Sequence, residues 1–575
     1  MQLTDAMREM YTLWTEKAVA DPDLKAELNN IRGNDEEIYE RFYRELEFGT
    51  AGLRGIIGAG TNRLNVYTIC KATQGLADFL NATCETPTVA IGYDSRHKSD
   101  EFSKAAAEVL AASGIKTYIF SELMPTPMLS YALCELKCDG GIIVTASHNP
   151  SKYNGFKCYG GNGYQMTDDE AAEAYGYISK LNLFEDIKRM DYDRAREKGL
   201  VEIISQSVLD GFYDAVLSQR INPDIYKETT LKVVYTPLNG AGNKPVREVL
   251  KRAGNNAVTI VKEQENPDGS FSTCPFPNPE IRQIFELALE LAKTVQPDLL
   301  LATDPDCDRV GIAVPDGQDY RLMSGNEVGC LLLEYILSSR KAAGNLPKNP
   351  MVVKTIVTTE LAVRIAEKYG CTLINVLTGF KYIGEQIGIL EDAGEPERYV
   401  FGFEESYGYL AGTHCRDKDA VVASLLICEM AAYYKSKGLS LIDVMENLYQ
   451  EYGNYLSSVE NFEFEGAAGM VKMQDLMTSL RENPPIGFAG YAVVRRCDYW
   501  ESVDYHLESG EEAAITLPKS NVLSYFLEGG NGVIVRPSGT EPKIKAYITA
   551  VGRNLEDARK VCEELSRAAK NLLAD

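Results

Sequence analysis

Apolar and polar positions repeat one pattern three times along the middle of the chain. In each copy an apolar strand is followed by a polar turn, a helix that ends near a glycine, and a second strand. The copies are residues 88–120, 231–261 and 351–377, and their helices end near Gly114, Gly254 and Gly370. The pattern predicts three α/β units, each with parallel strands covered by helices.

The two ends of the chain depart from this pattern. The first 45 residues are rich in Glu, Arg and Tyr at helical spacing and predict a helical arm. From about residue 455, shorter strands and a terminal amphipathic helix predict an α+β domain. The predicted organisation is therefore an arm over 1–45, three α/β domains over 46–205, 206–318 and 319–450, and a fourth domain over 451–575.

Composition narrows the class of protein. A chain of 575 residues is long enough for about three to five domains. Its net charge of −24 makes nucleic acid and acidic membranes unfavourable partners. No apolar run approaches the roughly 18 residues of a membrane span and no leader is recognisable, so we expect a cytoplasmic protein with no membrane partner. The 13 cysteines are scattered and never spaced C-x-x-C, which favours reduced thiols.

Each repeat is followed by another helix and a strand that stops at an unusual loop. The three loops read "TASHNP" at 145–150, "TDPDCDR" at 303–309 and "GFEESYGY" at 402–409. Ligands of open α/β sheets bind at the carboxyl ends of strands, so loops in equivalent places can face one cleft. Any one of them alone would be interpreted as an ordinary polar turn.

The second loop is the best candidate for a metal site. Asp304, Asp306 and Asp308 alternate as the chain leaves a strand, so their carboxylates can converge on one hard cation. An EF-hand is excluded, because its sixth and twelfth positions would be Arg309 and Pro315. Open coordination positions suit Mg²⁺ shared with a phosphoryl oxygen, whereas a solvated turn without a cation remains the alternative.

A fourth loop, "VRPSGTEPK" at 535–543, has the composition of a phosphate site. An arginine fork, small hydroxyl residues and backbone N–H groups freed by a glycine suit a phosphate dianion. The residues concerned are Arg536, Ser538, Gly539, Thr540 and Lys543. An ordinary Ser-Gly turn on a hairpin is an equally good interpretation of this segment alone.

Ser147 in the first loop is the candidate nucleophile. It lacks the glycines of a G-x-S-x-G elbow, which argues against an esterase. Ser147 and His148 are neighbours, and on an extended backbone they would point to opposite sides, which argues against a simple Ser-His pair. A serine that faces a metal site is better explained as a phosphoryl acceptor. A strand-ending turn is the alternative for "SHNP".

The four loops, in this order, resemble the active-site loops of the α-D-phosphohexomutases, and "GTAGLRG" at 49–55 resembles their N-terminal arginine motif. The resemblance runs from about residue 45 to the end of the chain. It implies a heart-shaped enzyme of four domains, three repeated α/β domains with mixed sheets and a C-terminal α+β domain. Each domain would contribute one loop to a central cleft.

The resemblance also implies a role for each loop. Ser147 would carry a phosphate and, with Asp304, Asp306 and Asp308, hold Mg²⁺; His148 belongs to the same catalytic motif. Arg54 and Arg309 would neutralise charge beside it. Lys157 and Lys381 both match lysines used as acid or base, and the sequence does not rank them. Sugar hydroxyls and the phosphate that is not reacting would be bound by Glu404, Ser406, Arg536, Ser538, Gly539, Thr540 and Lys543.

The implied reaction interconverts two sugar monophosphates through a sugar 1,6-bisphosphate. "EESYG" is closer to the glucose-type loop, so we expect glucose 1-phosphate and glucose 6-phosphate as substrates and glucose 1,6-bisphosphate as intermediate and activator. Mannose or pentose phosphates are the alternatives, as are a sugar-phosphate hydrolase and a non-catalytic sensor. Partners would be small sugar phosphates, and the enzyme a monomer or small homo-oligomer.

Overall fold

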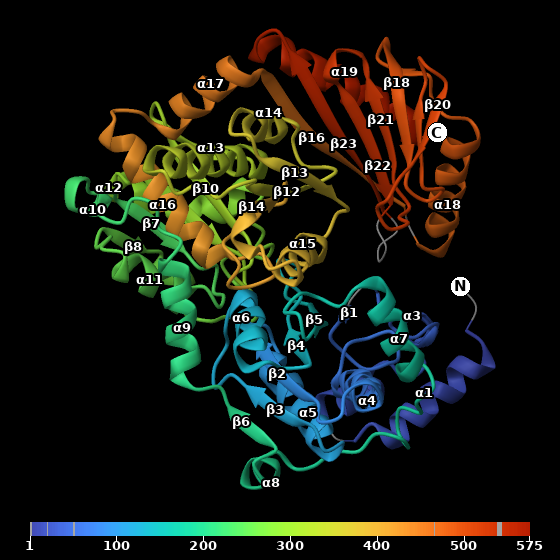
Figure 1. The fold of residues 1–575 in the computed structure, drawn as a ribbon. Helices are drawn as coiled ribbons and strands as arrows, with labels where there is room; N and C mark the ends of the chain where they lie inside the picture. Colours follow the sequence, from blue (N-terminus) through green and yellow to red (C-terminus); the bar gives the residue numbers. More distant parts are fainter. Residues whose placement is uncertain (1–2, 20, 50–51, 465, 538–542, 575) are drawn as a thin grey trace. The chain divides into compact units, whose positions relative to one another are not determined.

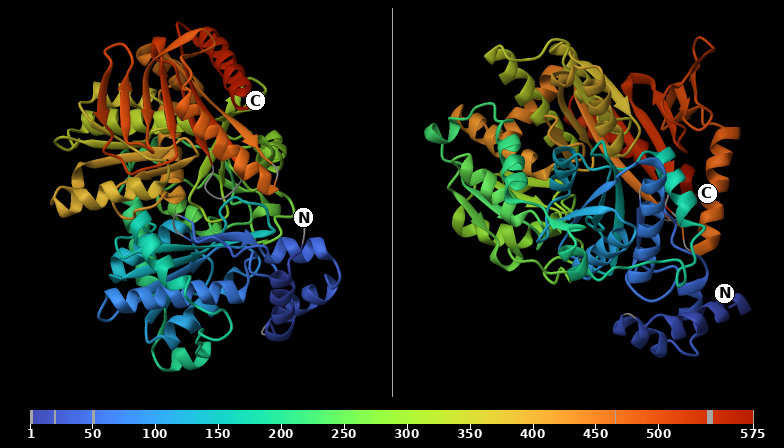
Figure 2. Two further views of the ribbon diagram at one scale, coloured as in Figure 1. Left: turned by 90° about the vertical axis from the view of Figure 1, so that its right-hand side faces the viewer. Right: turned by 60° about the horizontal axis from the view of Figure 1, so that its bottom comes forward.

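A computed structural model describes residues 3–19, 21–49, 52–464, 466–537 and 543–574. Figures 1 and 2 show the helices and strands of the chain as a ribbon. The chain divides into two compact units. Unit 1 comprises residues 1–323, 384–397 and 407–436, and unit 2 comprises residues 324–383, 398–406 and 437–575.

Unit 1 begins with three helices, α1 (Asp5–Lys17), α2 (Pro22–Asn30) and α3 (Asp35–Phe42). Thr4, Asp21 and Asn34 cap their N-termini by accepting backbone N–H groups. Trp14 is fully buried at their centre, with its ring 5.9 Å from Phe42 and 5.7 Å from Tyr67. Tyr67 lies on a later helix, so this tryptophan joins the three helices to the first sheet domain.

The first sheet has six strands in the order β1-β5-β4-β2-β3-β6. Strands β2, β3, β4 and β6 are parallel, whereas β5 runs antiparallel to both its neighbours, β4 and β1. β4 is buried along its whole length, as expected of a strand covered on both faces. The elements of this domain are β1 (Gly52–Ile56), α4 (Val66–Thr83), β2 (Thr88–Tyr93), α5 (Ser99–Ala112), β3 (Lys116–Ile119), α6 (Thr126–Leu136), β4 (Gly140–Val144), β5 (Tyr153–Gly160), α7 (Asp168–Ile178), α8 (Tyr192–Glu197) and β6 (Val201–Ile203).

The second sheet of unit 1 has five strands in the order β11-β10-β9-β7-β8. It is also mixed, because β10 runs antiparallel to both its neighbours, β9 and β11, whereas β7, β8 and β9 are parallel. In the first sheet β5 follows β4 and pairs with it in antiparallel fashion, and in the second sheet β10 does the same with β9. The serine loop and the aspartate loop, which join these pairs, are therefore hairpin connections. The elements are α9 (Gln206–Leu217), α10 (Ile225–Glu228), β7 (Val233–Thr236), α11 (Asn243–Arg252), β8 (Val258–Ile260), η1 (Lys262–Gln264), η2 (Arg282–Phe285), α12 (Glu286–Val295), β9 (Leu299–Thr303), β10 (Val310–Asp316) and β11 (Asp319–Met323).

The third repeat supplies elements to both units. In unit 2, β12 pairs with β13 on one side and with β14 on the other, all parallel. The unit 2 elements are α13 (Gly325–Ala343), β12 (Met351–Thr355), α14 (Leu361–Lys368), β13 (Thr372–Val376), β14 (Tyr399–Glu404) and α17 (Leu441–Tyr452). α15 (Phe380–Asp392) and η3 (Pro396–Arg398) begin in one unit and end in the other, and β15 (Gly408–Ala411) and α16 (Ala420–Ser436) belong to unit 1.

The C-terminal part of unit 2 is an antiparallel sheet with two helices, as predicted for a fourth, α+β domain (Figure 1). Its strands follow the order β16-β23-β22-β21-β18-β19-β20, and β17 pairs with β18. The elements are β16 (Asn454–Glu463), α18 (Gly466–Glu482), β17 (Gly487–Phe488), β18 (Tyr491–Asp498), β19 (Val503–His506), β20 (Glu511–Ala514), β21 (Leu523–Leu527), η4 (Glu528–Gly530), β22 (Gly532–Pro537), β23 (Lys543–Gly552) and α19 (Leu555–Ala574).

Among the described residues, no helix combines the length and the apolar character needed to cross a bilayer.

Asn65 fixes the connection between β1 and α4. Its side-chain oxygen accepts the N–H groups of Tyr67 and Thr68, each at 3.1 Å. Its amide nitrogen donates to the carbonyls of Gly58 at 2.9 Å and Gly60 at 3.0 Å. Asn65 is 1% exposed, so water cannot take over the hydrogen bonds that its side chain makes to these backbone groups.

We predict that Asn65→Ala lowers the free energy of unfolding by about 2–4 kcal/mol, from a lost helix cap and buried carbonyls without donors. Urea and thermal unfolding midpoints measure the effect. Asn81→Ala is the matched control, because Asn81 lies on the same helix, is exposed and makes a single bond to the Ser113 carbonyl. Equal shifts in both variants would contradict this role of Asn65.

Candidate active site

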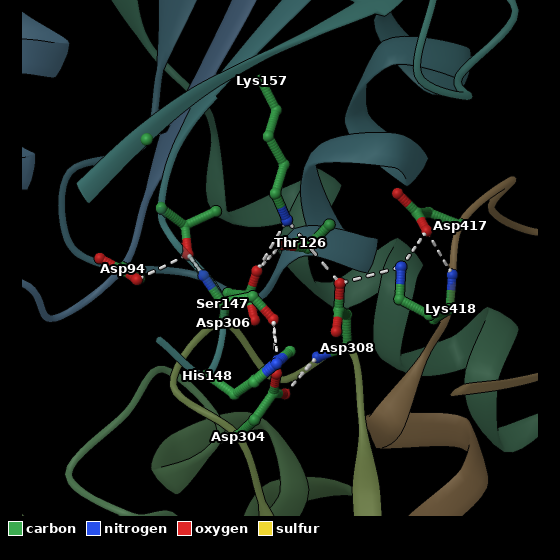
Figure 3. Close-up of polar contacts among 12 residues, drawn as sticks. Asp94, Thr126, Ser147, His148, Lys157, Asp304, Asp306, Asp308, Asp417 and Lys418 are labelled. Carbon is green, nitrogen blue, oxygen red and sulfur yellow. Dashed lines mark hydrogen bonds and ion pairs between the residues drawn. The ribbon is translucent and has the colours of Figure 1, made fainter. Parts of the chain in front are cut away.

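The serine loop follows β4 and holds its nucleophile in an unusual backbone conformation. Ser147 has a φ of 53°, in the left-handed region that costs a non-glycine residue about 1–2 kcal/mol. Its N–H donates to Thr145 Oγ1 at 2.8 Å, and that hydroxyl donates to Asp94 Oδ2 at 2.7 Å (Figure 3). The conformation is therefore maintained by buried hydrogen bonds.

Arg96 fixes the same loop from the turn after β2. Its guanidinium donates to the carbonyls of Ser147 and Asn149, both at 2.5 Å, and to those of Pro150 and Tyr153 at 3.1 and 3.0 Å. Arg96 is 3% exposed and lies over the ring of Phe271 at 5.0 Å. One side chain of the first sheet domain thus binds four carbonyls around the serine and packs on the second sheet domain.

The aspartate loop follows β9 and lies against the serine. Asp304, Asp306 and Asp308 are all at most 1% exposed, and their candidate ligand atoms lie within 4.8 Å of one another. Ser147 Oγ donates to Asp304 Oδ2 at 3.0 Å (Figure 3). The serine and aspartate loops of the prediction are therefore in direct contact within unit 1.

The aspartates share a strained electrostatic environment. Burial, and then the charges of Asp306 and Asp308, raise the pKa of Asp304 well above its usual value. Burial and Asp306 likewise raise the pKa of Asp308. For Asp306, burial is outweighed by Lys157, Lys418 and a hydrogen bond from Asp304, so its pKa is lowered. Because three carboxylates repel at this distance, the loop favours an added positive charge.

The donor set fits a hard divalent cation. Asp306 Oδ1 and Asp308 Oδ1 are buried and have no hydrogen-bond partner among the described residues. Oxygen ligands that converge with unpartnered lone pairs are typical of Mg²⁺ sites that keep positions open for a phosphate.

Two lysines lie against these carboxylates. Lys157, on β5, places Nζ 3.1 Å from Asp306 Oδ2. Lys418 places Nζ 3.0 Å from Asp308 Oδ2 and 2.9 Å from Asp417 Oδ1 (Figure 3). Asp417 also accepts a hydrogen bond from Tyr159 at 2.5 Å. Lys157 was among the predicted residues, whereas Lys418 was not.

His148 contacts the serine, contrary to the argument from an extended backbone. Its Nδ1 is 3.1 Å from Ser147 Oγ. The prediction of opposite sides was wrong, because Ser147 is not extended and its left-handed backbone turns the two side chains toward each other. Burial, followed by Arg309 and Arg54, lowers the pKa of His148 well below its usual value, so the ring is neutral near pH 7.

The two predicted arginines of unit 1 lie at the edge of this cluster. Arg54, on β1, donates to Asn149 Oδ1 at 3.2 Å. Arg309 donates to Glu280 Oε1 at 3.1 Å, and its Nε is 3.8 Å from Asp308 Oδ1. Arg54 thus reaches the serine loop from β1, whereas Arg309 is the last residue of the aspartate loop itself.

Unit 2 holds the remaining predicted residues. Glu404, at the end of β14, accepts the Gly379 N–H at 3.0 Å, two residues before Lys381 on α15. Arg536, on β22, lies near Tyr547 of β23, whose pKa is raised by burial and Glu405. The sugar loop and the phosphate arginine therefore lie near one another within unit 2. Ser406 and Lys543 are partly buried, while Ser538, Gly539 and Thr540 lie outside the described residues.

Residues outside the predicted set also support these loops. Arg96 and Asp94 lie in "YDSRH", the turn after β2, and Lys418 and Asp417 in "HCRDKD", between β15 and α16. Both segments carried a signal, a run of charges next to a buried strand. Thr126, whose N–H donates to the Asp306 carbonyl at 2.9 Å, carried none.

Comparisons with known proteins give the same assignment over most of the chain. Three models described as phosphoglucomutase/phosphomannomutase, α/β/α domains I, II and III, match residues 45–183, 210–317 and 324–452. A phosphoglucomutase of Staphylococcus haemolyticus is 37% identical over 91% of this chain and 93% of its own length. One from Staphylococcus aureus is 38% identical over 92% and 94%.

Solved structures show the same fold. Phosphoglucomutase from Paramecium in an open form has a TM-score of 0.67 at 18% identity, over 92% of this chain and 96% of that one. A phosphoglucomutase/phosphomannomutase family protein from Burkholderia thailandensis has a TM-score of 0.64 at 18% identity, over 91% and 97%.

These relatives define the class of enzyme as intramolecular phosphotransferases, which belong to the isomerases. Within that class, the chain belongs to the phosphoglucomutase/phosphomannomutase family, the α-D-phosphohexomutases, and has their four-domain fold.

We predict that Arg96→Lys lowers kcat for sugar-phosphate turnover by about 10–100-fold with little change in KM. Lysine keeps the charge but cannot bind four carbonyls, and a small misplacement of the reacting group costs up to about 10²-fold. Steady-state kinetics measure the split, and intact mass reports the phosphate on the protein. Arg189→Lys, which changes an exposed ion pair with Glu108, is the control. A rise in KM alone would place Arg96 in substrate binding instead.

Proposed function

We propose that this protein interconverts α-D-glucose 1-phosphate and glucose 6-phosphate through a phosphorylated Ser147 and a glucose 1,6-bisphosphate intermediate. The observation that carries the proposal is the contact of Ser147 Oγ with Asp304, beside two carboxylates that each have one oxygen without a hydrogen-bond partner in the described part of the chain. The assignment to glucose follows relatives named phosphoglucomutase at 37–38% identity and the "EESYG" loop.

In the proposed reaction the phosphoryl group passes from Ser147 to a free sugar hydroxyl. The bond between phosphorus and Ser147 Oγ breaks, a bond to the sugar oxygen forms, and the hydroxyl proton ends on Oγ. After the bisphosphate turns end for end, the reverse transfer returns its other phosphate to Ser147. A magnesium ion held by Asp304, Asp306 and Asp308 would neutralise phosphoryl charge.

The protein's own residues perform the remaining tasks. The Arg96 and Thr145 hydrogen bonds hold Oγ in line with the aspartate loop, and neutral His148 accepts or donates a hydrogen bond at Oγ. Lys157 and Lys418 are basic groups next to the metal ligands, and either can carry the proton from the sugar hydroxyl to Ser147 Oγ. Arg54 and Arg309 add positive charge beside the transferred group.

The proposal assigns unit 2 to substrate recognition. Glu404 and Ser406 would bind sugar hydroxyls, and Arg536 with Ser538, Gly539, Thr540 and Lys543 the phosphate that is not reacting. Lys381 remains a candidate acid or base.

We predict preferential turnover of α-glucose 1-phosphate over mannose 1-phosphate and ribose 1-phosphate, each with Mg²⁺ and a trace of glucose 1,6-bisphosphate. Ser147→Ala loses both turnover and the phosphate seen by intact mass, because no other group accepts it. Equal or better use of mannose or ribose phosphate would keep the mechanism but reject the glucose assignment. Phosphate release as fast as isomerisation would indicate a hydrolase, and an unphosphorylated, inactive wild type would favour a sensor.

We predict that Lys157→Met and Lys418→Met each lower kcat by about 10²–10⁴-fold, the range for a positioned acid or base. Lys381→Met tests the third candidate under the same conditions. Lys104→Met, on the exposed face of α5, is the control and retains normal kcat. A variant with near-normal turnover excludes that lysine from proton transfer.

A further inference from the structure

A second group of metal-ligating side chains lies in unit 1, in the segment between β15 and α16. His414, Cys415 and Asp419 have candidate ligand atoms within 4.8 Å of one another. None of the three belongs to the aspartate loop, and the proposed reaction uses none of them.

The group is buried. Cys415 and Asp419 are fully buried, and the side chain of His414 is 4% exposed. His414 Nε2 is 2.8 Å from Asp419 Oδ2, whereas His414 Nδ1 has no hydrogen-bond partner among the described residues. Nε2 is therefore the ring nitrogen that faces Asp419 and would coordinate an ion shared with it. The Cys415 thiol makes one weak contact, with the Asp417 carbonyl at 3.4 Å.

Imidazole, thiolate and carboxylate together form a typical zinc donor set, and such a site keeps a fourth position for water. Magnesium prefers oxygen ligands alone, so this site and the aspartate loop differ in the ions they select. We propose that His414, Cys415 and Asp419 bind a thiophilic divalent cation, with zinc as the reference ion. On binding, the Cys415 S–H bond breaks, a sulfur–metal bond forms, and the proton goes to solvent.

Occupancy of this site affects Lys418. Lys418 lies between Cys415 and Asp419 in the sequence, and its Nζ contacts Asp308 at 3.0 Å. Asp419 Oδ1 accepts the N–H groups of Val421 and Val422 at 2.7 and 3.0 Å, so the far side of the segment is tied to α16. When a metal ion binds, His414 and Cys415 move toward Asp419, which is held by α16. The segment between them moves as well, and Lys418 is displaced from Asp308. Zinc therefore inhibits turnover; this consequence rests on the proposed function, whereas metal binding does not.

Cobalt binding to the full-length protein in excess Mg²⁺ tests the site directly. Cobalt bound by a thiolate gives a near-ultraviolet charge-transfer band, which the carboxylates of the aspartate loop do not produce. We expect the band in the wild type, its loss in Cys415→Ser, and its displacement by zinc. Cys428→Ser is the matched control, because Cys428 is a buried thiol on α16 outside the group. A band that persists in Cys415→Ser, or no band in the wild type, overturns the proposal.

Competition with a chromophoric chelator gives the affinity, which we expect to fall at least about tenfold in Cys415→Ser, as metal sites respond to loss of a supporting group. Unfolding midpoints without metal show whether the variant is folded, and Cys415→Ala repeats the test without a hydroxyl. Inhibition by zinc at saturating Mg²⁺ should weaken by the same factor. Equal inhibition of wild type and variant would overturn the coupling to Lys418. If the protein lacks mutase activity, the cobalt band still shows whether His414, Cys415 and Asp419 bind a metal ion.

Discussion

Repulsion among three buried carboxylates is the constraint on which the centre of unit 1 depends. Asp304, Asp306 and Asp308 follow one strand and are shielded from water, where like charges repel most strongly. Backbone N–H groups of residues 308 and 309 bind Asp304, and two lysines face the other two carboxylates. These lysines come from β5 and from the segment before α16, so the chain brings distant parts together to stabilise one loop. The remaining deficit of positive charge gives the loop its affinity for a cation.

The serine loop depends on a different kind of support. Asp94, Thr145 and Arg96 fix its backbone, and Arg96 packs on Phe271 from the second sheet domain. His97 Nε2 is 2.8 Å from Ser270 Oγ. The backbones are also close here, because a Cβ added at Gly269 would lie 2.7 Å from the backbone nitrogen of His97. The two sheet domains are thus joined beside the nucleophile, and the contact of Ser147 with Asp304 rests on this junction as well as on the loops themselves.

Much of this arrangement can be predicted from sequence, because the periodicity of apolar residues and the order of motifs can be recognised within short segments of the chain. The three repeated units, the C-terminal α+β domain, the loops at strand ends and the aspartate triplet all follow from short segments. The antiparallel strands β5 and β10 do not, since the pattern of a returning strand resembles that of a parallel one. Lys418 and Arg96 also escape prediction, because their importance lies in which distant backbone or carboxylate they meet. The prediction that His148 points away from Ser147 failed for a local reason, because Ser147 is a left-handed residue that is not glycine.

That left-handed residue has a consequence for evolution and engineering. Cys307 and Tyr407, in the aspartate and sugar loops, also have positive φ values, of 52° and 67°. Glycine adopts this conformation without penalty, yet it offers no hydroxyl to accept a phosphate. At position 147 the stability of the fold therefore favours glycine, whereas the reaction requires the serine hydroxyl. A search for stabilising substitutions would select glycine and so remove the nucleophile. The serine is kept only as long as selection acts on turnover, and a descendant released from that selection would be expected to lose it first.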